Sequence, residues 1–222
     1  MSVTFKALAA LLAYPTEDLV AALPEIRAIV GQARGLPRAL RAELAALVDE
    51  LAAGDLIELQ ERYVSLFDRG RATSLHLFEH VHGESRDRGQ AMVDLKAEYA
   101  RAGLTLVGGE LPDYLPALLE FLSLQPQAVA DVMLGESAPL LRKVGNALAQ
   151  RDARYAHVLA AALALVGEPG LDEVVADVEP DRPIDEEWAE APVIFGPAAA
   201  PSCGAHAPAS AVVKFMPRAA GR

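Results

Sequence analysis

Three side chains near the middle of the 222-residue chain have the types and spacing of a zinc hydrolase site. His76 and His80 match an HxxEH pattern, in which two histidines four apart on a helix bind zinc and a glutamate, here Glu79, acts as the base. His82 lies near enough in sequence to be a third ligand. Only three positions of this pattern are fixed, so it often occurs by chance. There are two alternatives. The histidines could bind a structural metal incidentally, or they could form a loop cluster that packs and hydrogen-bonds without metal.

The sequence around this pattern favours the reading without metal. Residues 68–88 are rich in Gly, His and charge, and helical periodicity fails there, so the segment is a poor scaffold for a metal. The chain has no GxxxxGK[ST], GxGxxG or GxSxG motif, and its one cysteine, Cys203, lies in the predicted C-terminal tail. We therefore predict no catalytic residue, no metal and no cofactor.

The composition predicts an all-α protein. Hydrophobic residues make up 52% of the chain and aromatic residues only 5%, so Ala and Leu, both good helix formers, carry the apolar content. We expect a single-domain helical bundle of about eight to ten helices with a disordered C-terminal tail.

Capping residues and prolines predict where these helices begin and end. We expect Pro24 to break the second helix, Pro37 and Gly54 to bound the third, Asp55 to cap the fourth, and Asp113 to cap an apolar helix that runs to Leu124. The other predicted helices cover residues 3–13, 92–103, 126–134, 137–150 and 152–166.

Charge divides the chain into three parts, 1–167, 168–196 and 197–222. The first is the expected helical domain. The second part is acidic: residues 168–190 carry ten acidic residues and one basic residue, so they account for most of the chain's net charge of −11. The Trp188–Phe195 segment is expected to pack back onto the helical domain. The Ala/Pro-rich third part is expected to be disordered. No basic stripe is present, so we expect no nucleic-acid partner. Without a secretory signal or a long apolar run, a cytoplasmic protein with no membrane insertion is expected.

Two kinds of stretch have both a structural and a functional interpretation. Residues 84–89 (ESRDRG) read either as a solvated helix start or as a polar rim beside an apolar groove. The aromatic and leucine stripes that contain Tyr63, Phe67, Leu118 and Phe121 are more often core than groove.

Five motifs, occurring in order, resemble the respiratory nitrate reductase assembly chaperones of the NarJ type. They are residues 63–68 (YVSLFD), 74–83 (SLHLFEHVHG), 85–92 (SRDRGQAM), 111–116 (LPDYLP) and 186–195 (EEWAEAPVIF). The resemblance covers about residues 3–196. It implies a single all-helical fold shared with other molybdenum-enzyme chaperones. It also implies that the chain is not an enzyme.

The resemblance implies that the partner is the apo catalytic (alpha) subunit of respiratory nitrate reductase. The chaperone would bind its N-terminal leader-like helix until the molybdenum cofactor and an iron–sulfur cluster are inserted, and it would be a monomer or weak dimer. The wider group has a Pro-Asp-His motif where this chain has Pro112-Asp113-Tyr114, so the histidine has no direct counterpart. A helical adaptor for another protein is the remaining alternative.

The residues expected to bind the leader are apolar groove residues and the charged or polar groups around them. We expect Asp113 to pair with a leader cation, so that its replacement by Asn weakens binding and flattens the salt dependence. The full set is Tyr63, Phe67, Leu75, His76, Phe78, Glu79, His80, Glu84, Arg86, Arg88, Pro112, Asp113, Tyr114, Leu118 and Phe121.

Overall fold

The computed structural model describes residues 2–82, 86–106 and 109–172, and these residues form nine α-helices and one short 3-10 helix. In chain order they are α1 (Ser2–Leu12), α2 (Glu17–Gln32), α3 (Arg38–Ala53), α4 (Leu56–Phe67), η1 (Arg71–Thr73), α5 (Leu77–His82), α6 (Arg86–Arg101), α7 (Leu115–Ser123), α8 (Gln127–Arg151) and α9 (Ala153–Leu165). The prediction of an all-α bundle is confirmed.

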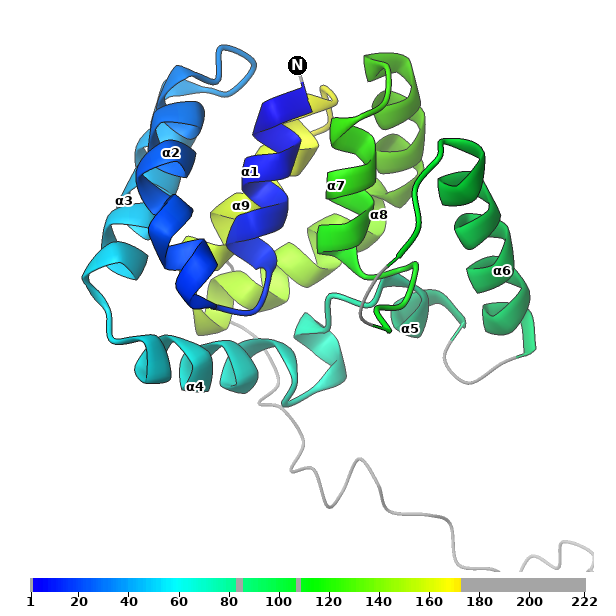
Figure 1. Ribbon diagram of the computed structural model, residues 1–222, viewed down its shortest axis with the longest axis horizontal. Helices are drawn as coiled ribbons and strands as arrows, with labels where there is room; N and C mark the ends of the chain where they lie inside the picture. The colour runs from blue at the N-terminus through cyan, green and yellow to red at the C-terminus, as the bar shows by residue number, and fades with distance from the viewer. Residues whose placement is uncertain (1, 83–85, 107–108, 173–222) are drawn as a thin grey trace, which may run out of the picture. The chain divides into compact units, whose positions relative to one another are not determined.

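Helix α1 lies at the centre of these helices, between α2 and α7 and in front of α9 (Figure 1). Its side chains Phe5, Leu8, Leu11 and Leu12 are at most 2% exposed, and Ala7 and Ala9 between them are buried as well. A helix with so wide an apolar surface must be covered on most sides, so the neighbouring helices enclose α1 except around Val3 and Lys6, which are exposed. The core therefore sits on α1 and α9; α4 adds one buried face to it, and α5 and α6 add mainly Leu77 and Tyr99.

Two prolines lie inside helices and break neither of them. The expected break at Pro24 is wrong, because α2 is continuous, and the expected spacer at Gly135 is wrong, because α8 continues past it and past Pro139. Both prolines are exposed. The carbonyl that loses its hydrogen-bond partner to a proline can then be hydrated, which lowers the cost of keeping the helix intact.

A cluster of charged side chains fixes the position of α4. Asp55 caps this helix, as predicted, and accepts hydrogen bonds from the first backbone N–H groups. From the middle of α4, Arg62 pairs with Glu50 of α3 and with Asp152, and its Nε lies 2.8 Å from the Asp152 carboxylate. Asp152 also caps α9. One guanidinium thus joins α4 to two core helices and leaves the opposite face of α4 free for other contacts.

Beyond α9 the described chain runs along α8 to Asp172. Asp172 and Asn146 exchange two hydrogen bonds of 2.7 and 3.1 Å, and Arg142 donates to the Gly170 carbonyl at 3.2 Å. The start of the acidic segment is therefore packed against α8. The expected docking of Trp188–Phe195 and the expected disorder of 197–222 lie outside the described residues. Among those that are described, no helix has the length and apolar content to cross a membrane.

Candidate functional site

Two of the sequence motifs pair side by side as short extended segments. The backbone N–H of Leu115 donates to the Leu75 carbonyl at 2.9 Å, and the N–H of Leu77 donates to the Asp113 carbonyl at 3.1 Å. His76 and Tyr114 form an antiparallel bridge between these bonds. The pairing brings together residues almost 40 positions apart, so the LPDY and SLHLFEH motifs form one structural unit.

Asp113 is the buried centre of this unit. Its side chain is fully buried, and its Oδ2 accepts a hydrogen bond of 2.9 Å from the Phe78 N–H at the start of α5. The prediction that Asp113 caps α7 is wrong: Tyr114 occupies the N-cap of α7 without a side-chain bond, and Asp113 caps α5 from a distant part of the chain. A carboxylate without solvent access cannot meet a leader cation in this structure, so the salt-dependent role expected of Asp113 has no geometric basis here.

A chain of ring contacts runs outward from Asp113. His76 Nδ1 lies 3.5 Å from Asp113 Oδ1, and the His76 ring lies 5.3 Å from that of Tyr114. The hydroxyls of Tyr114 and Tyr63 are 2.8 Å apart, and Tyr63 donates to the carbonyl of Leu12 at the end of α1. Burial raises the pKa of both tyrosines, so both stay neutral donors. We call Asp113, His76, Tyr114 and Tyr63 the polar chain.

The polar chain places an imidazole, from a different segment of the chain, beside the Pro112-Asp113 pair. The resemblance left the histidine of the Pro-Asp-His motif without a counterpart, because Tyr114 occupies that position. In the structure His76 stands next to Asp113 instead. Sequence spacing alone does not reveal this placement, because it depends on the pairing of the two segments.

The arrangement does not support the zinc reading. His76 precedes α5, so His76 and His80 do not share a helical face. Each of the three groups already has a partner: His76 faces Asp113, His80 Nε2 lies 2.9 Å from the Ser74 carbonyl, and Glu79 accepts from Ser74 Oγ at 2.7 Å. Within residues 2–82, 86–106 and 109–172, no three His, Cys, Asp or Glu side chains are placed to hold a metal ion.

The pair of His76 and Asp113 makes stability depend on pH. The adjacent Asp113 carboxylate raises the pKa of His76 above its ordinary value, against the opposing effect of burial; Glu79 adds to the rise and Arg88 opposes it. Since the folded state holds this proton more tightly, the stabilisation is complete below about pH 6.5 and is lost as the pH rises through the folded-state pKa. Urea unfolding between pH 5.5 and 8.5 should show His76→Gln falling furthest below the wild type at the acid end. A gap between the two proteins that does not change with pH would contradict this assignment.

The expected leader-binding residues are placed in three ways. Tyr63, Phe67, Leu75, Pro112, Asp113, Leu118 and Phe121 are buried; His76, Phe78, Glu79, His80, Arg88 and Tyr114 are half-buried; Arg86 begins α6, with its side chain outside the described part, and Glu84 lies outside it altogether. The apolar members are therefore core in this structure, because they fill the contacts between α1, α4, α7 and α9. They do not form the wall of an open groove.

An open groove does exist, on the outer face of α4. It is a cavity of about 610 Å³ whose apolar side chains include Tyr14, Ile57 and Val64. Tyr14 is 45% exposed and Ile57 66%, large values for apolar side chains. Tyr14 packs edge-on against Tyr63 at 5.5 Å, so the groove adjoins the polar chain. The residues that line this α4 groove are Tyr14, Ile57, Gln60, Glu61, Val64, Ser65 and Arg69.

Sequence reasoning missed the α4 groove, although a signal was present. The buried stripe of α4 is Leu59, Tyr63, Leu66 and Phe67. Ile57 lies outside this stripe. Val64 lies seven residues after Ile57, or about two helical turns, so Ile57 and Val64 are on the same face of α4. A single exposed apolar residue needs no explanation, but apolar residues gathered on one face outside the core stripe indicate a surface for a partner.

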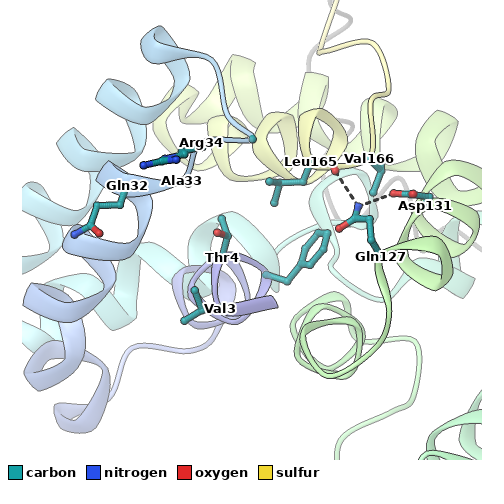
Figure 2. Close-up of a pocket in the computed structure, with 11 residues that line it drawn as sticks. Val3, Thr4, Gln32, Ala33, Arg34, Gln127, Asp131, Leu165 and Val166 are labelled. Atoms are coloured by element: carbon teal, nitrogen blue, oxygen red, sulfur yellow. Dashed lines mark hydrogen bonds between the residues drawn. The ribbon is translucent and has the colours of Figure 1, made fainter. Parts of the chain in front are cut away.

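A second cavity of about 610 Å³ lies at the other end of α1 (Figure 2). Val3, Arg34, Asp131 and Leu165 are among its lining residues. Gln127 donates a hydrogen bond of 3.1 Å to the Leu165 carbonyl, which joins α8 to the end of α9, and it donates a second one to Asp131 within α8 (Figure 2). This cavity lies where the ends of α1, α2, α8 and α9 meet, and we assign it no ligand.

Comparison with solved structures shows the fold first. A putative redox enzyme maturation protein from Archaeoglobus fulgidus has the same fold, with a TM-score of 0.54 and 21% sequence identity over 75% of this chain and 91% of that one. At this identity the likeness shows the fold alone.

Comparison of sequences defines the family. A family model described as nitrate reductase delta subunit matches residues 33–161. The chain is 42% identical over 193 residues to the nitrate reductase molybdenum cofactor assembly chaperone NarJ of Escherichia coli K12, covering 83% of this chain and 81% of that protein. It is 34% identical over 168 residues to the probable NarJ chaperone of Bacillus subtilis, covering 74% and 90%. The chain belongs to the nitrate reductase delta subunit family, and like its relatives it is an assembly factor rather than an enzyme.

Proposed function

We propose that this protein is the assembly chaperone of a respiratory nitrate reductase, and that it binds the N-terminal leader-like helix of the apo catalytic subunit. Family membership supports the class of client. The observation that carries the binding mode is the open α4 groove, where the apolar side chains Tyr14, Ile57 and Val64 lie among polar and charged ones. The chaperone holds the subunit, in the cytoplasm, until the molybdenum cofactor and an iron–sulfur cluster are in place.

The size and apolar content of the α4 groove suit a short helix. Helix α4 has 12 residues, and a rise of about 1.5 Å per residue gives it a length of about 18 Å. A client helix of about three turns laid along it would bring apolar residues at i, i+3, i+4 and i+7 against Tyr14, Ile57 and Val64. This recognition mode requires an amphipathic helix.

The charges around the α4 groove favour a basic helix. Glu58 and Glu61 lie exposed on α4 and Asp68 at its C-terminal end, and among the described residues Arg69 is the one cation that lines the groove. The first turn of α2, with two exposed acids, starts next to Pro15, whose carbonyl accepts a hydrogen bond of 2.9 Å from Gln60. Lysines and arginines on the polar face of the client helix would meet this acidic rim, which speeds association and orients the helix.

The function is tested by the fate of the client in cells that lack this protein. We expect the apo catalytic subunit to co-purify with the wild-type protein when the leader is present, and not when the leader is deleted. Nitrate reductase activity should be lost without the chaperone and restored by the wild-type gene. Capture of the leaderless subunit at full yield would contradict leader binding, and capture of an unrelated protein in its place would favour the adaptor interpretation.

A further inference from the structure

Helix α6 is attached to the rest of the molecule at few points. Among residues 87–101 only Tyr99 is buried, at 2% exposure, while Val93 on the outer face is 61% exposed. The helix lies at the margin of the described helices (Figure 1). After α6 the chain turns at Gly103, whose φ of +78° favours glycine. A helix with so little buried surface is expected to open at low free-energy cost.

The seat of Tyr99 is a built pocket for an aromatic side chain with a hydroxyl. The ring packs 4.7 Å from that of Phe121 on α7, and the hydroxyl donates a hydrogen bond of 2.7 Å to the Pro112 carbonyl. Pro112 directly precedes the polar chain, so the pocket adjoins the paired motifs. If Tyr99 leaves, the pocket offers an aromatic wall and an unpaired carbonyl to whatever replaces it.

The inner face of α6 shows which helix the seat accepts. Arg88, Met92, Leu95 and Tyr99 follow one another at intervals of four, three and four residues, which is one helical face. Arg88 pairs with Glu79 of α5 at 3.2 Å, Leu95 packs against the core, and Tyr99 fills the pocket. A partner helix with a cation, two apolar residues and an aromatic residue at the same spacing would make the same contacts.

We propose that α6 is a displaceable helix, and that its seat is a second client-binding surface for an amphipathic helix with an aromatic anchor. The occupant is a helix of the client polypeptide other than the one in the α4 groove. This inference rests on the client-binding function proposed above. It also gives Glu79 and Phe121 a binding role that the closed structure withholds, because Arg88 and Tyr99 of α6 contact them.

The first test supplies the helix in trans. A labelled peptide copying residues 86–101 is titrated against the full-length protein, wild type and Tyr99→Ala. The wild type should bind weakly, because its own α6 competes at an effective concentration on the order of millimolar. Tyr99→Ala should bind at least tenfold more tightly, and a peptide whose tyrosine is replaced by alanine should bind neither protein. Equal affinity of both proteins for the two peptides would overturn the proposal, as would a Tyr99→Ala dimer formed by exchange of α6.

The second test uses the wild-type chain, so it does not depend on the folding of the variant. Hydrogen exchange of residues 87–101 is measured for the free protein and for its complex with the apo catalytic subunit. The proposal predicts faster exchange of α6 in the complex, with α9 unchanged. A complex in which α6 exchanges at the same rate or more slowly overturns the proposal while the chaperone function stands. Failure to form any complex counts against the chaperone function itself.

Discussion

Replacement of Asp113 by alanine is expected to lower the free energy of unfolding by about 3 kcal/mol. The substitution removes the acceptor for the Phe78 N–H at the start of α5 and leaves a buried polar cluster beside His76 without its charge partner. Unpaired buried groups account for most of the cost. Urea unfolding followed by circular dichroism measures the change, and α5 amides should exchange faster in the variant.

Two further variants separate this capping role from direct leader contact. Asp113→Asn keeps an acceptor for the Phe78 N–H and loses only the charge, so it should be the milder change. Asp18→Ala removes an exposed acid in the first turn of α2 and should cost about 0.5 kcal/mol. If Asp113→Asn leaves stability unchanged and flattens the salt dependence of leader binding, Asp113 contacts the client and the buried placement is wrong.

Truncation of Ile57 is expected to weaken leader binding about tenfold without lowering stability. The side chain is 66% exposed in the free protein and would be buried by a client helix in the α4 groove. Loss of about 1.5 kcal/mol of apolar burial corresponds to that factor. The measurement is calorimetric titration of Ile57→Ala with a leader peptide. Val132→Ala is the matched control, because Val132 is 58% exposed on α8 and does not line the groove; an equal loss in both variants would place the leader elsewhere.

The charge of the α4 groove makes a separate prediction. Glu61→Gln should weaken binding at low salt and reduce the slope of affinity against salt, because exposed charges act through screened attraction. Glu136→Gln, on the exposed surface of α8, should leave the slope unchanged. An unaltered slope in Glu61→Gln would show that the acidic rim does not meet the client.

The helices were largely predictable because their signals are local. Caps such as Asp55 and Asp152, and stops such as Gly54, act within a few residues of the helix ends that they set. Pro24 and Gly135 misled the prediction, since both are weak helix formers that α2 and α8 nevertheless contain; whether such a residue breaks a helix depends on its surroundings, which the sequence does not state. Local sequence signals therefore predict the presence of a helix better than they predict whether two neighbouring helical segments form one continuous helix.

The candidate site was predictable in its parts and not in its geometry. The motifs at 74–83 and 111–116 were identified together, and the structure pairs them through Leu75, Leu77 and Leu115. That Asp113 caps α5 and faces His76 follows only from this long-range pairing. Tyr63 and Phe121 belong to stripes that are more often core than groove, yet they were among the expected leader-binding residues; in the structure both are buried in the core. The surface that remains open lies on residues outside those stripes.

The central claim is that this protein binds the leader helix of the nitrate reductase catalytic subunit. Calorimetric titration of the full-length protein with a peptide copying that leader, from the same organism, tests it most directly. We predict saturable one-to-one binding with a negative heat-capacity change, because an apolar helix face is buried. No binding at any salt concentration or pH between 5.5 and 8.5 would contradict the claim.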